Sequence, residues 1–424
     1  MKILIIAAFF PPMNTIGALR PYSWAKNSCK ENDVTVICSG KQKTDFDLDI
    51  SLQGFKVIDF VRCNENTQCY SGVNLKSRLK NIKLLKKLFR FFCSKTGCFY
   101  GIRYPDVHDK WAREVIKYFT EKKEKFDVVI STGGPYSVHR IGLYLKKQGL
   151  ANDWIIDWRD LWTKNPYFRG FPLFWIYEKM LERSFHRNCD RIITVSDGCR
   201  EILTKQTNKN VITIFNGYDI DDYKSITNTE RIKDSKLRIV YTGNLYGKHR
   251  DPSILFLAIK ELFEENKIEE GDILVTFAGQ NCDITKKIEL MGIKPFFEYV
   301  GMLKRPEALR LQYNADVLLF LEHESKKIKG ILTGKLFEYL YIAEFILALG
   351  ISENCEAGSV IKKSCKGLCV KKSIKDVKKI LLEKLEEKKA YKSELSYMVD
   401  FDFIKQFDRS VLAEKLYSIL KDRK

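Results

Sequence analysis

The sequence contains no apolar run long enough to cross a bilayer, and it is poor in histidine. No stretch of about 18 apolar residues occurs among the 424 residues, so we expect no transmembrane helix. The five histidines are scattered, and the twelve cysteines form no Cys-x-x-Cys pair. We therefore expect no metal site and interpret the cysteines as reduced residues of a cytosolic protein.

Acidic residues are scarce relative to basic ones. The chain carries 54 Asp and Glu against 73 Lys and Arg, a net charge of +19. This excess predicts an anionic partner, which could be nucleic acid, a membrane surface or a phosphorylated small molecule. The composition, 45% hydrophobic and 30% charged, is that of a globular protein and excludes global disorder and fibrous architectures.

Short β-branched runs alternate with amphipathic stretches along the chain. The first run, residues 2–8, ends at Pro11-Pro12 without a cleavage site, so we interpret it as a buried strand rather than a signal peptide. The alternation predicts an α/β fold with parallel sheets covered by helices on both faces. Strands are predicted at 2–8, 33–38, 56–61, 127–131, 154–157, 191–195, 211–215, 237–242, 273–278, 297–301, 317–321, 346–349 and 367–370.

A polar segment without apolar periodicity, residues 219–236, divides the chain. It predicts one Rossmann-like domain at 1–220 and a second at 221–400. Residues 401–424 are predicted to form a C-terminal helix that packs back on the N-terminal domain, because apolar residues recur there at helical spacing. Ligands of such sheets bind at the carboxyl ends of the strands, so we expect a site in a cleft between the domains.

Two loops of the second domain are typical of phosphate binding. The strand at 237–242 is followed by Gly243 and Asn244, and then by Lys248 and Arg250, whose cations can neutralise a diphosphate. The alternative is a solvated basic loop. A second loop contains Leu332, Thr333, Gly334 and Lys335 and leads into a helix that carries Glu338. Glu338 is a candidate for binding ribose hydroxyls, and the alternative is an ordinary charge near a helix N-terminus.

The first domain offers weaker candidates. Gly17 lies in the loop that follows the first strand, where a plain strand–helix turn is the alternative. His139 lies near the start of a predicted helix, and a lone histidine is more often structural than catalytic. Asp157, Arg159 and Asp160 follow another strand; they suggest a site, although an internal Arg–Asp bridge would also explain them.

The most basic segment is 76–95. On a helical wheel one side gathers Lys76, Lys80, Lys83, Lys87 and Arg90, while apolar residues occupy the other. This pattern is typical of a helix lying in an anionic membrane interface. A helix packed on its own domain with a solvated basic face is the alternative. We find no nucleic-acid recognition module, so nucleic acid is the partner that we do not expect.

Taken together, these segments resemble a known family. The resemblance is carried most strongly by residues 11–20, 126–162, 189–196, 216–219, 242–252 and 333–340. In order and spacing they resemble family 4 glycosyltransferases, closest to the branch found in bacterial capsule, O-antigen and exopolysaccharide gene clusters. The resemblance covers nearly the whole chain. It implies the GT-B fold and transfer of a sugar from a nucleotide-diphosphate donor, with retention at the anomeric carbon.

The resemblance also implies roles for single residues. Residues 1–220 would bind the acceptor and residues 221–400 the donor. Gly17 would approach the donor phosphate, Lys248 and Arg250 would hold the diphosphate, and backbone N–H groups around 332–334 would complete the site. Glu338 would bind the ribose, and His139 would lie beside the reacting sugar as the catalytic candidate. No metal or other cofactor is expected, because cations and helix ends replace it in this family.

The chain departs from the family pattern at several positions. Ile16 replaces one of two glycines in the first loop, and Asn244 replaces an arginine. Gly330 stands where the family has the first of two glutamates eight residues apart, and Ala343 and Phe345 replace a glycine and a proline. The missing glutamate usually helps to hold the donor sugar, so donor identity stays open.

We therefore predict a retaining, hexosyltransferase-type enzyme at the inner face of the cytoplasmic membrane. Its partners would be a nucleotide sugar, a saccharide acceptor that is lipid-linked, and an anionic membrane surface. Its product would be a cell-surface polysaccharide such as capsule, O-antigen or lipopolysaccharide. The alternatives are a nucleotide-sugar epimerase of the same fold and a non-catalytic polyanion-binding protein.

Overall fold

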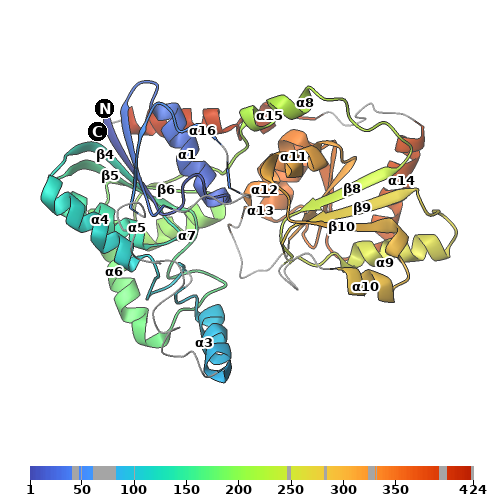
Figure 1. The fold of residues 1–424 in the computed structure, drawn as a ribbon, viewed down its shortest axis with the longest axis horizontal. Helices are drawn as coiled ribbons and strands as arrows, with labels where there is room; N and C mark the ends of the chain where they lie inside the picture. The colour runs from blue at the N-terminus through green and yellow to red at the C-terminus, as the bar shows by residue number, and fades with distance from the viewer. Residues whose placement is uncertain are drawn as a thin grey trace. The chain divides into compact units, whose positions relative to one another are not determined.

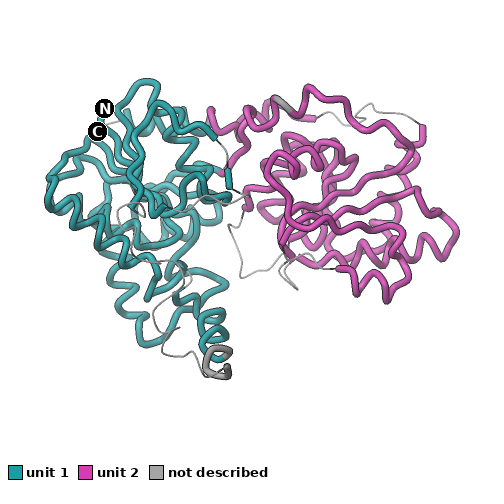
Figure 2. The backbone as a smooth tube through the Cα atoms, in the orientation of Figure 1, with its two compact units in different colours: residues 1–215, 412–424 teal, residues 216–411 magenta. Residues whose placement is uncertain are grey.

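The structure is a computed structural model of the chain. It describes residues 1–40, 47–48, 50–60, 83–99, 101–245, 250–280, 284–322, 330, 332–390 and 399–421. The chain forms two compact units, coloured separately in Figure 2. Unit 1 comprises Met1–Phe215 and Leu412–Lys424, and unit 2 comprises Asn216–Val411. The division falls within a few residues of the predicted domain boundary at 220.

Unit 1 is built on a parallel sheet of seven strands in the order β3-β2-β1-β4-β5-β6-β7 (Figure 1). The strands are β1 (Lys2–Ala7), β2 (Asp33–Cys38), β3 (Lys56–Asp59), β4 (Phe126–Thr132), β5 (Ala151–Trp158), β6 (Arg191–Thr194) and β7 (Val211–Thr213). The helices are α1 (Ile16–Ser28), α3 (Lys83–Thr96), α4 (Asp109–Lys122), α5 (Ser137–Lys147), η1 (Pro172–Phe174), α6 (Trp175–Asn188) and α7 (Asp197–Thr207).

The central strands of unit 1 are apolar because helices cover both faces of the sheet. Successive side chains of β1 point to opposite faces, and Ile3 and Ile5 enter one core while Leu4 and Ile6 enter the other. The first core includes Leu412, Leu416 and Leu420 of α16 (Arg409–Lys421).

The predicted C-terminal segment holds two helices rather than one. Besides α16 it contains α15 (Phe401–Lys405), which belongs to unit 2. Tyr417 of α16 donates a hydrogen bond to Glu31 of unit 1 at 2.7 Å. The last helix thus returns to the sheet on which the chain began.

Unit 2 has the same kind of architecture, a parallel sheet with helices, and its six strands lie in the order β10-β9-β8-β11-β12-β13. The strands are β8 (Leu237–Thr242), β9 (Ile273–Ala278), β10 (Phe297–Gly301), β11 (Val317–Leu321), β12 (Phe345–Leu349) and β13 (Gly367–Val370). Its helices are η2 (Ile220–Asp222), α8 (Lys224–Thr227), α9 (Ser253–Glu264), α10 (Thr285–Leu290), η4 (Lys294–Phe296), α11 (Arg305–Tyr313), α12 (Gly334–Ile342), α13 (Glu356–Ser364), α14 (Ile374–Lys389) and α15.

All thirteen predicted strands are present, so the strand prediction and the α/β fold class are confirmed. Helices α9 and α14 pack against the core of unit 2, which includes Phe256, Ile259, Val377 and Leu381. Within the described part of the chain, no helix is both long and apolar enough to cross a bilayer.

Candidate active site

The donor-side candidates of unit 2 lie where the strand order reverses. β8 and β11 are neighbours, but β9 and β10 lie beyond β8 whereas β12 and β13 lie beyond β11. The loops that follow β8 and β11 therefore leave in opposite directions, and ligands of open α/β sheets bind at such a point. Gly243, Asn244 and Arg250 follow β8, and Leu332 through Glu338 follow β11.

The two loops meet at Gly243. The Nζ atom of Lys335, in the first turn of α12, lies 4.0 Å from the ring centroid of Tyr241 on β8. A Cβ atom built on Gly243 would lie only 2.4 Å from that Nζ, and the φ angle of Gly243 is 130°. Both facts favour glycine here, because a side chain would be strained and would displace the ammonium group. Gly243 and Lys335, two donor-side candidates from separate loops, are thus neighbours in the fold.

Asn244 and Arg250 are held in a small polar network. The backbone oxygen of Asn244 accepts hydrogen bonds from the Tyr241 hydroxyl at 2.9 Å and from Arg250 Nη1 at 3.4 Å. Its side-chain oxygen accepts from the backbone N–H of Gln280, at the end of β9, at 3.0 Å. Arg250 Nη2 lies 3.7 Å from a carboxylate oxygen of Glu322, which directly follows β11. The guanidinium of Arg250 is thus held at the carboxyl edge of the sheet.

Glu338 is buried on α12 and already has a cationic partner. Arg305 Nη1 donates to Glu338 at 3.0 Å, and Nη2 of the same guanidinium donates to Asp222 at 2.6 Å. Sequence reasoning missed Arg305. One signal was available. Arg305 is the first residue of α11, where the helix dipole disfavours a cation, so an anionic partner outside the helix is expected to compensate its charge.

The start of α12 is suited to an anion. Thr333 occupies the N-cap with an extended backbone, and its side chain makes no capping hydrogen bond to the first turn. The N–H groups of that turn, together with Lys335 and Arg250, form a positive region at the switch point. Gly330, with a φ of 83°, lies just before this loop. Lys248 lies outside the described residues.

His139 of unit 1, the catalytic candidate, is fully buried. Its Nδ1 atom lies 2.8 Å from the hydroxyl of Ser131, which also accepts from the Trp154 indole at 2.9 Å. A Cβ atom on Gly133 would lie 2.3 Å from His139 Nε2, and that nitrogen has no hydrogen-bond partner among the described residues. Burial lowers the pKa of His139 well below its usual value, so the ring is neutral. The ring packs edge-on against Trp158, with 4.2 Å between the ring centroids.

Arg159 links the start of α1 to the glycine-containing loop after β4. Its guanidinium donates to the backbone oxygens of Gly17, at 2.6 Å, Gly133, at 2.6 Å, and Gly134, at 2.8 Å. A Cβ atom on Gly17 would lie 2.5 Å from Arg159 Nη1. The space above Gly17, which was predicted to admit a donor phosphate, is thus used by Arg159.

Asp157 forms an Arg–Asp bridge, but its partner is Arg20 of α1 and not an arginine of its own segment. Both of its carboxylate oxygens accept from the buried Arg20 of α1, at 2.9 and 3.0 Å, and one also accepts from the Thr132 hydroxyl at 2.7 Å. Arg20 also donates to the backbone oxygen of Ile214 at 2.8 Å. Of the three acceptor-side candidates, Asp160 is the one whose side chain is exposed.

The basic segment forms α3 from Lys83 onward; Lys76 and Lys80 lie outside the described residues. Two residues of its predicted membrane-facing apolar side pack within unit 1 instead. The rings of Phe89 and Phe99 lie 5.6 Å apart, and those of Phe92 and Phe171 lie 5.3 Å apart. For these two rings the interpretation as a helix packed on its own domain is correct. Lys83, Lys87 and the exposed Arg90 lie on α3.

No group of three His, Cys, Asp or Glu side chains able to hold a metal occurs among the described residues. The candidate site consists of cations, a helix N-terminus and a carboxylate. It can bind a polyanion beside a group with hydroxyls, which is the chemistry of a nucleoside diphosphate.

Comparisons with known proteins agree with this architecture. The family model described as Glycosyltransferase Family 4 matches residues 99–222. The chain matches no curated protein sequence. Among solved structures, it resembles a glycosyltransferase from Rickettsia africae with a TM-score of 0.61 and 12% identity, covering 99% of this chain and 97% of the other.

Two further solved structures share the fold over their whole length. The trehalose-6-phosphate synthase OtsA has a TM-score of 0.63 and 11% identity, with 100% of both chains covered. The lipopolysaccharide outer core galactosyltransferase WaaB has a TM-score of 0.55 and 14% identity, with 99% of both chains covered.

The two parallel-sheet units confirm the predicted GT-B fold. The fold and the family match together support a glycosyltransferase of the GT-B type. The family match also confirms the predicted resemblance, which is to family 4 of the glycosyltransferases.

Proposed function

We propose that the chain transfers a sugar from a nucleotide-diphosphate donor to a saccharide acceptor, with retention of the anomeric configuration. The donor binds to unit 2. The observation that carries this proposal lies at the switch point between β8 and β11, where Lys335 lies against Gly243 and Arg250 donates to the adjacent Asn244. A diphosphate placed there is contacted by two cations and by the first turn of α12.

The same groups account for the chemical step. When the bond between the anomeric carbon and the diphosphate oxygen breaks, negative charge develops on the leaving nucleotide diphosphate. Cations and helix N–H groups that are already in place stabilise that charge without reorganising, which is a large source of rate enhancement in enzymes. The proposal needs no metal, because Lys335 and Arg250 take that electrostatic role.

Glu338 is proposed to accept hydrogen bonds from the two ribose hydroxyls. Its carboxylate lies on α12 one turn beyond Lys335, and Arg305 donates to it at 3.0 Å and fixes its position. An ionised carboxylate has about four acceptor sites and can therefore keep Arg305 while it binds hydroxyls.

We further propose a lipid-linked acceptor at the inner face of the cytoplasmic membrane and a role in cell-surface polysaccharide synthesis. Two observations support this part: the net charge of +19, and the fold shared with a lipopolysaccharide galactosyltransferase. The epimerase and the polyanion-binding protein are the alternatives, and no described contact favours either.

A screen of nucleotide sugars tests the proposal. We expect one class, such as UDP- or GDP-sugars, to raise the unfolding temperature, since a ligand that binds the folded state stabilises it. The stabilising donor should then support transfer to a lipid-linked saccharide, and proton NMR of the first-formed product should show the donor's anomeric configuration. Inverted product would refute the retaining mechanism. Conversion of the donor sugar without transfer would indicate an epimerase.

A further inference from the structure

Unit 1 exposes several large apolar side chains on the consecutive elements η1 and α6. Leu173 of η1 is 75% exposed, and Ile176 and Met180 of α6 are 74% and 64% exposed. Trp175 and Tyr177, on the same turns, are also exposed. Single exposed apolar residues are common on soluble proteins, but a contiguous group marks an interaction surface. We call the exposed side chains of residues 163–187 the apolar–basic face.

Helix α3 lies beside this face. The backbone N–H of Gly170 donates to the backbone oxygen of Thr96, at the end of α3, at 3.0 Å, and the rings of Phe92 and Phe171 are in contact. Leu88 and Phe91 of α3 are more than half exposed. Figure 1 shows α3 and α6 extending from unit 1 on the side away from the chain termini. The apolar side chains of both helices thus belong to one substructure.

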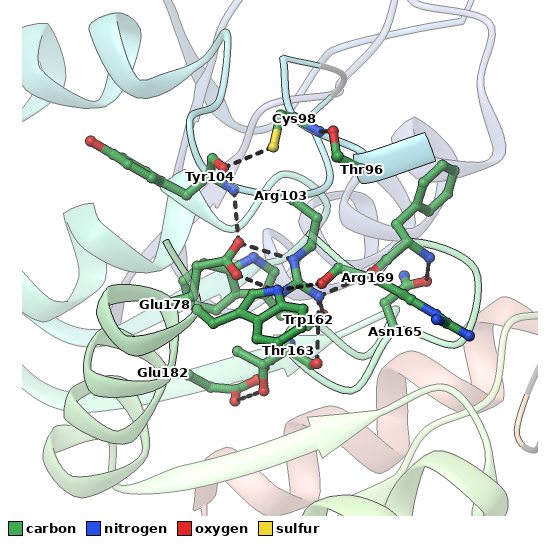
Figure 3. Close-up of polar contacts among 12 residues, drawn as sticks. Thr96, Cys98, Arg103, Tyr104, Trp162, Thr163, Asn165, Arg169, Glu178 and Glu182 are labelled. Atoms are coloured by element: carbon green, nitrogen blue, oxygen red, sulfur yellow. Dashed lines mark hydrogen bonds and ion pairs between the residues drawn. The ribbon is translucent and has the colours of Figure 1, made fainter. Parts of the chain in front are cut away.

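A pocket of about 390 Å³ opens in the apolar–basic face. Figure 3 shows the polar contacts around Arg103, which lines it. Arg103 is 2% exposed; it pairs with both carboxylate oxygens of Glu178, at 2.9 and 2.5 Å, and donates to the backbone oxygens of Trp162 and Phe168. These bonds fix the loop that forms the wall. The pocket is lined by Arg103, Thr163, Lys164, Asn165, Arg169, Trp175 and Lys179.

Charges of opposite sign are separated across this segment. Both of its acidic residues point inward: Glu178 binds Arg103, and Glu182 accepts from the hydroxyl of Thr163 at 2.5 Å. Every charged side chain that the segment exposes is basic, namely Lys164, Arg169, Lys179, Arg183 and Arg187. Lys164, Arg169 and Lys179 form no ion pair with another described residue. Among the described residues, the pocket therefore presents three exposed cations without an ion pair, beside exposed apolar side chains.

We propose that the apolar–basic face docks on an anionic lipid bilayer, and that the pocket binds the phosphate of a lipid headgroup. Leu173, Ile176 and Met180 enter the boundary between headgroups and acyl chains, while Lys164 and Lys179 remain with the phosphates. Exposed Trp and Tyr side chains suit the same interface. An acidic peptide or a nucleic acid would satisfy the cations but leave the apolar side chains in water. The inference rests on the proposed function in that a lipid-linked acceptor places its enzyme at a bilayer.

Flotation of the full chain with vesicles tests the proposal. We expect binding to vesicles of phosphatidylcholine with phosphatidylglycerol and little binding to phosphatidylcholine alone. The triple variant Lys164→Gln, Arg169→Gln, Lys179→Gln should weaken the partition about a hundredfold, since each cation near an anionic surface contributes about 1 kcal/mol. The matched control neutralises three exposed lysines of unit 2: Lys286→Gln, Lys372→Gln, Lys375→Gln.

A second pair of variants tests the apolar part. Leu173→Ser with Ile176→Ser keeps the charge and should also weaken the partition at least tenfold, whereas Leu290→Ser, an 81% exposed position of unit 2, should not. The substituted positions of the apolar–basic face are all exposed, so the unfolding temperature should stay unchanged in every variant; they are Lys164, Arg169, Leu173, Ile176 and Lys179.

Three outcomes overturn the proposal. Equal losses in the pocket triple and its unit 2 control would show diffuse charge attraction. Unchanged binding of the Leu173 and Ile176 variant would show that no apolar insertion occurs. A thermal shift with inorganic diphosphate that the triple abolishes, without flotation, would show a soluble anion instead. Nucleotide-sugar binding should persist in all docking variants; its absence from the wild-type chain would refute the proposed function and leave the docking result intact.

Discussion

Arg159 gives the sharpest test of how unit 1 is assembled. Its guanidinium donates to three backbone oxygens, that of Gly17 in the first turn of α1 and those of Gly133 and Gly134 in the loop after β4. The segments that follow β1 and β4 flank the point where the strand order of unit 1 reverses. Arg159→Met keeps the apolar stem but removes all three donors, so the start of α1 and the loop after β4 lose their shared anchor.

The expected cost follows from these bonds. A hydrogen bond from a charged donor contributes about 1.5 kcal/mol or more, but the side chain is half-buried, so water can partly replace it. We expect a loss of about 3 kcal/mol in the free energy of unfolding. For domains of about 150–250 residues this lowers the unfolding temperature by about 6–12 °C. Thermal unfolding followed by circular dichroism measures it.

A neighbouring arginine provides the control. Arg140 pairs with Asp109 at 2.8 Å on the part-exposed surface of unit 1, so Arg140→Met should cost about 1 kcal/mol or less. If Arg159→Met abolished sugar transfer while the unfolding temperature stayed at the wild-type value, Arg159 would be an acceptor ligand and the anchoring role would be wrong.

Two further predictions concern buried charge. Burial lowers the pKa of His186 to about 4 and that of His139 well below 6.5, so the unfolded chain binds protons below pH 6.5 that the folded chain does not. The free energy of unfolding should therefore fall as the pH falls from 6.5, and His186 alone should lower it by about 2 kcal/mol at pH 5. Urea denaturation midpoints that do not move between pH 7 and pH 5 would contradict this. In unit 2, Arg305→Met leaves the carboxylates of Glu338 and Asp222 without their cation and should cost about 3 kcal/mol. Adding Glu338→Gln to the Arg305→Met variant should recover part of the lost free energy of unfolding. No recovery in the double variant would show that Arg305 and Glu338 are not coupled.

The strands and the fold class could be predicted from the sequence because they depend on local pattern. Parallel strands covered on both faces are short apolar runs, and those runs were visible at every strand. The two glycine-containing loops of the second domain could also be named from the sequence, because each follows an apolar run and precedes a helix. That Gly243 and Lys335 lie against each other is shown only by the structure.

Partners distant in the sequence could not be predicted. Asp157 and Arg20 are 137 residues apart, and nothing local shows that their charges neutralise each other. The same holds for Arg103 and Glu178, 75 residues apart. A helical wheel likewise shows that an amphipathic helix has an apolar side but not what covers it. The membrane and the chain's own domain therefore both stayed open for this helix until the structure showed Phe92 of α3 against Phe171.

Calorimetric titration with a nucleoside diphosphate tests the central claim most directly. The claim is that the cluster of Gly243, Arg250, Lys335 and Glu338 on unit 2 holds the donor nucleotide. We predict that the wild-type chain binds the diphosphate of the donor that its screen identifies, and that Arg250→Ala and Glu338→Ala each weaken binding at least tenfold, whereas the distant Lys375→Ala leaves it unchanged. Binding that survives both Arg250→Ala and Glu338→Ala at wild-type affinity would contradict the account.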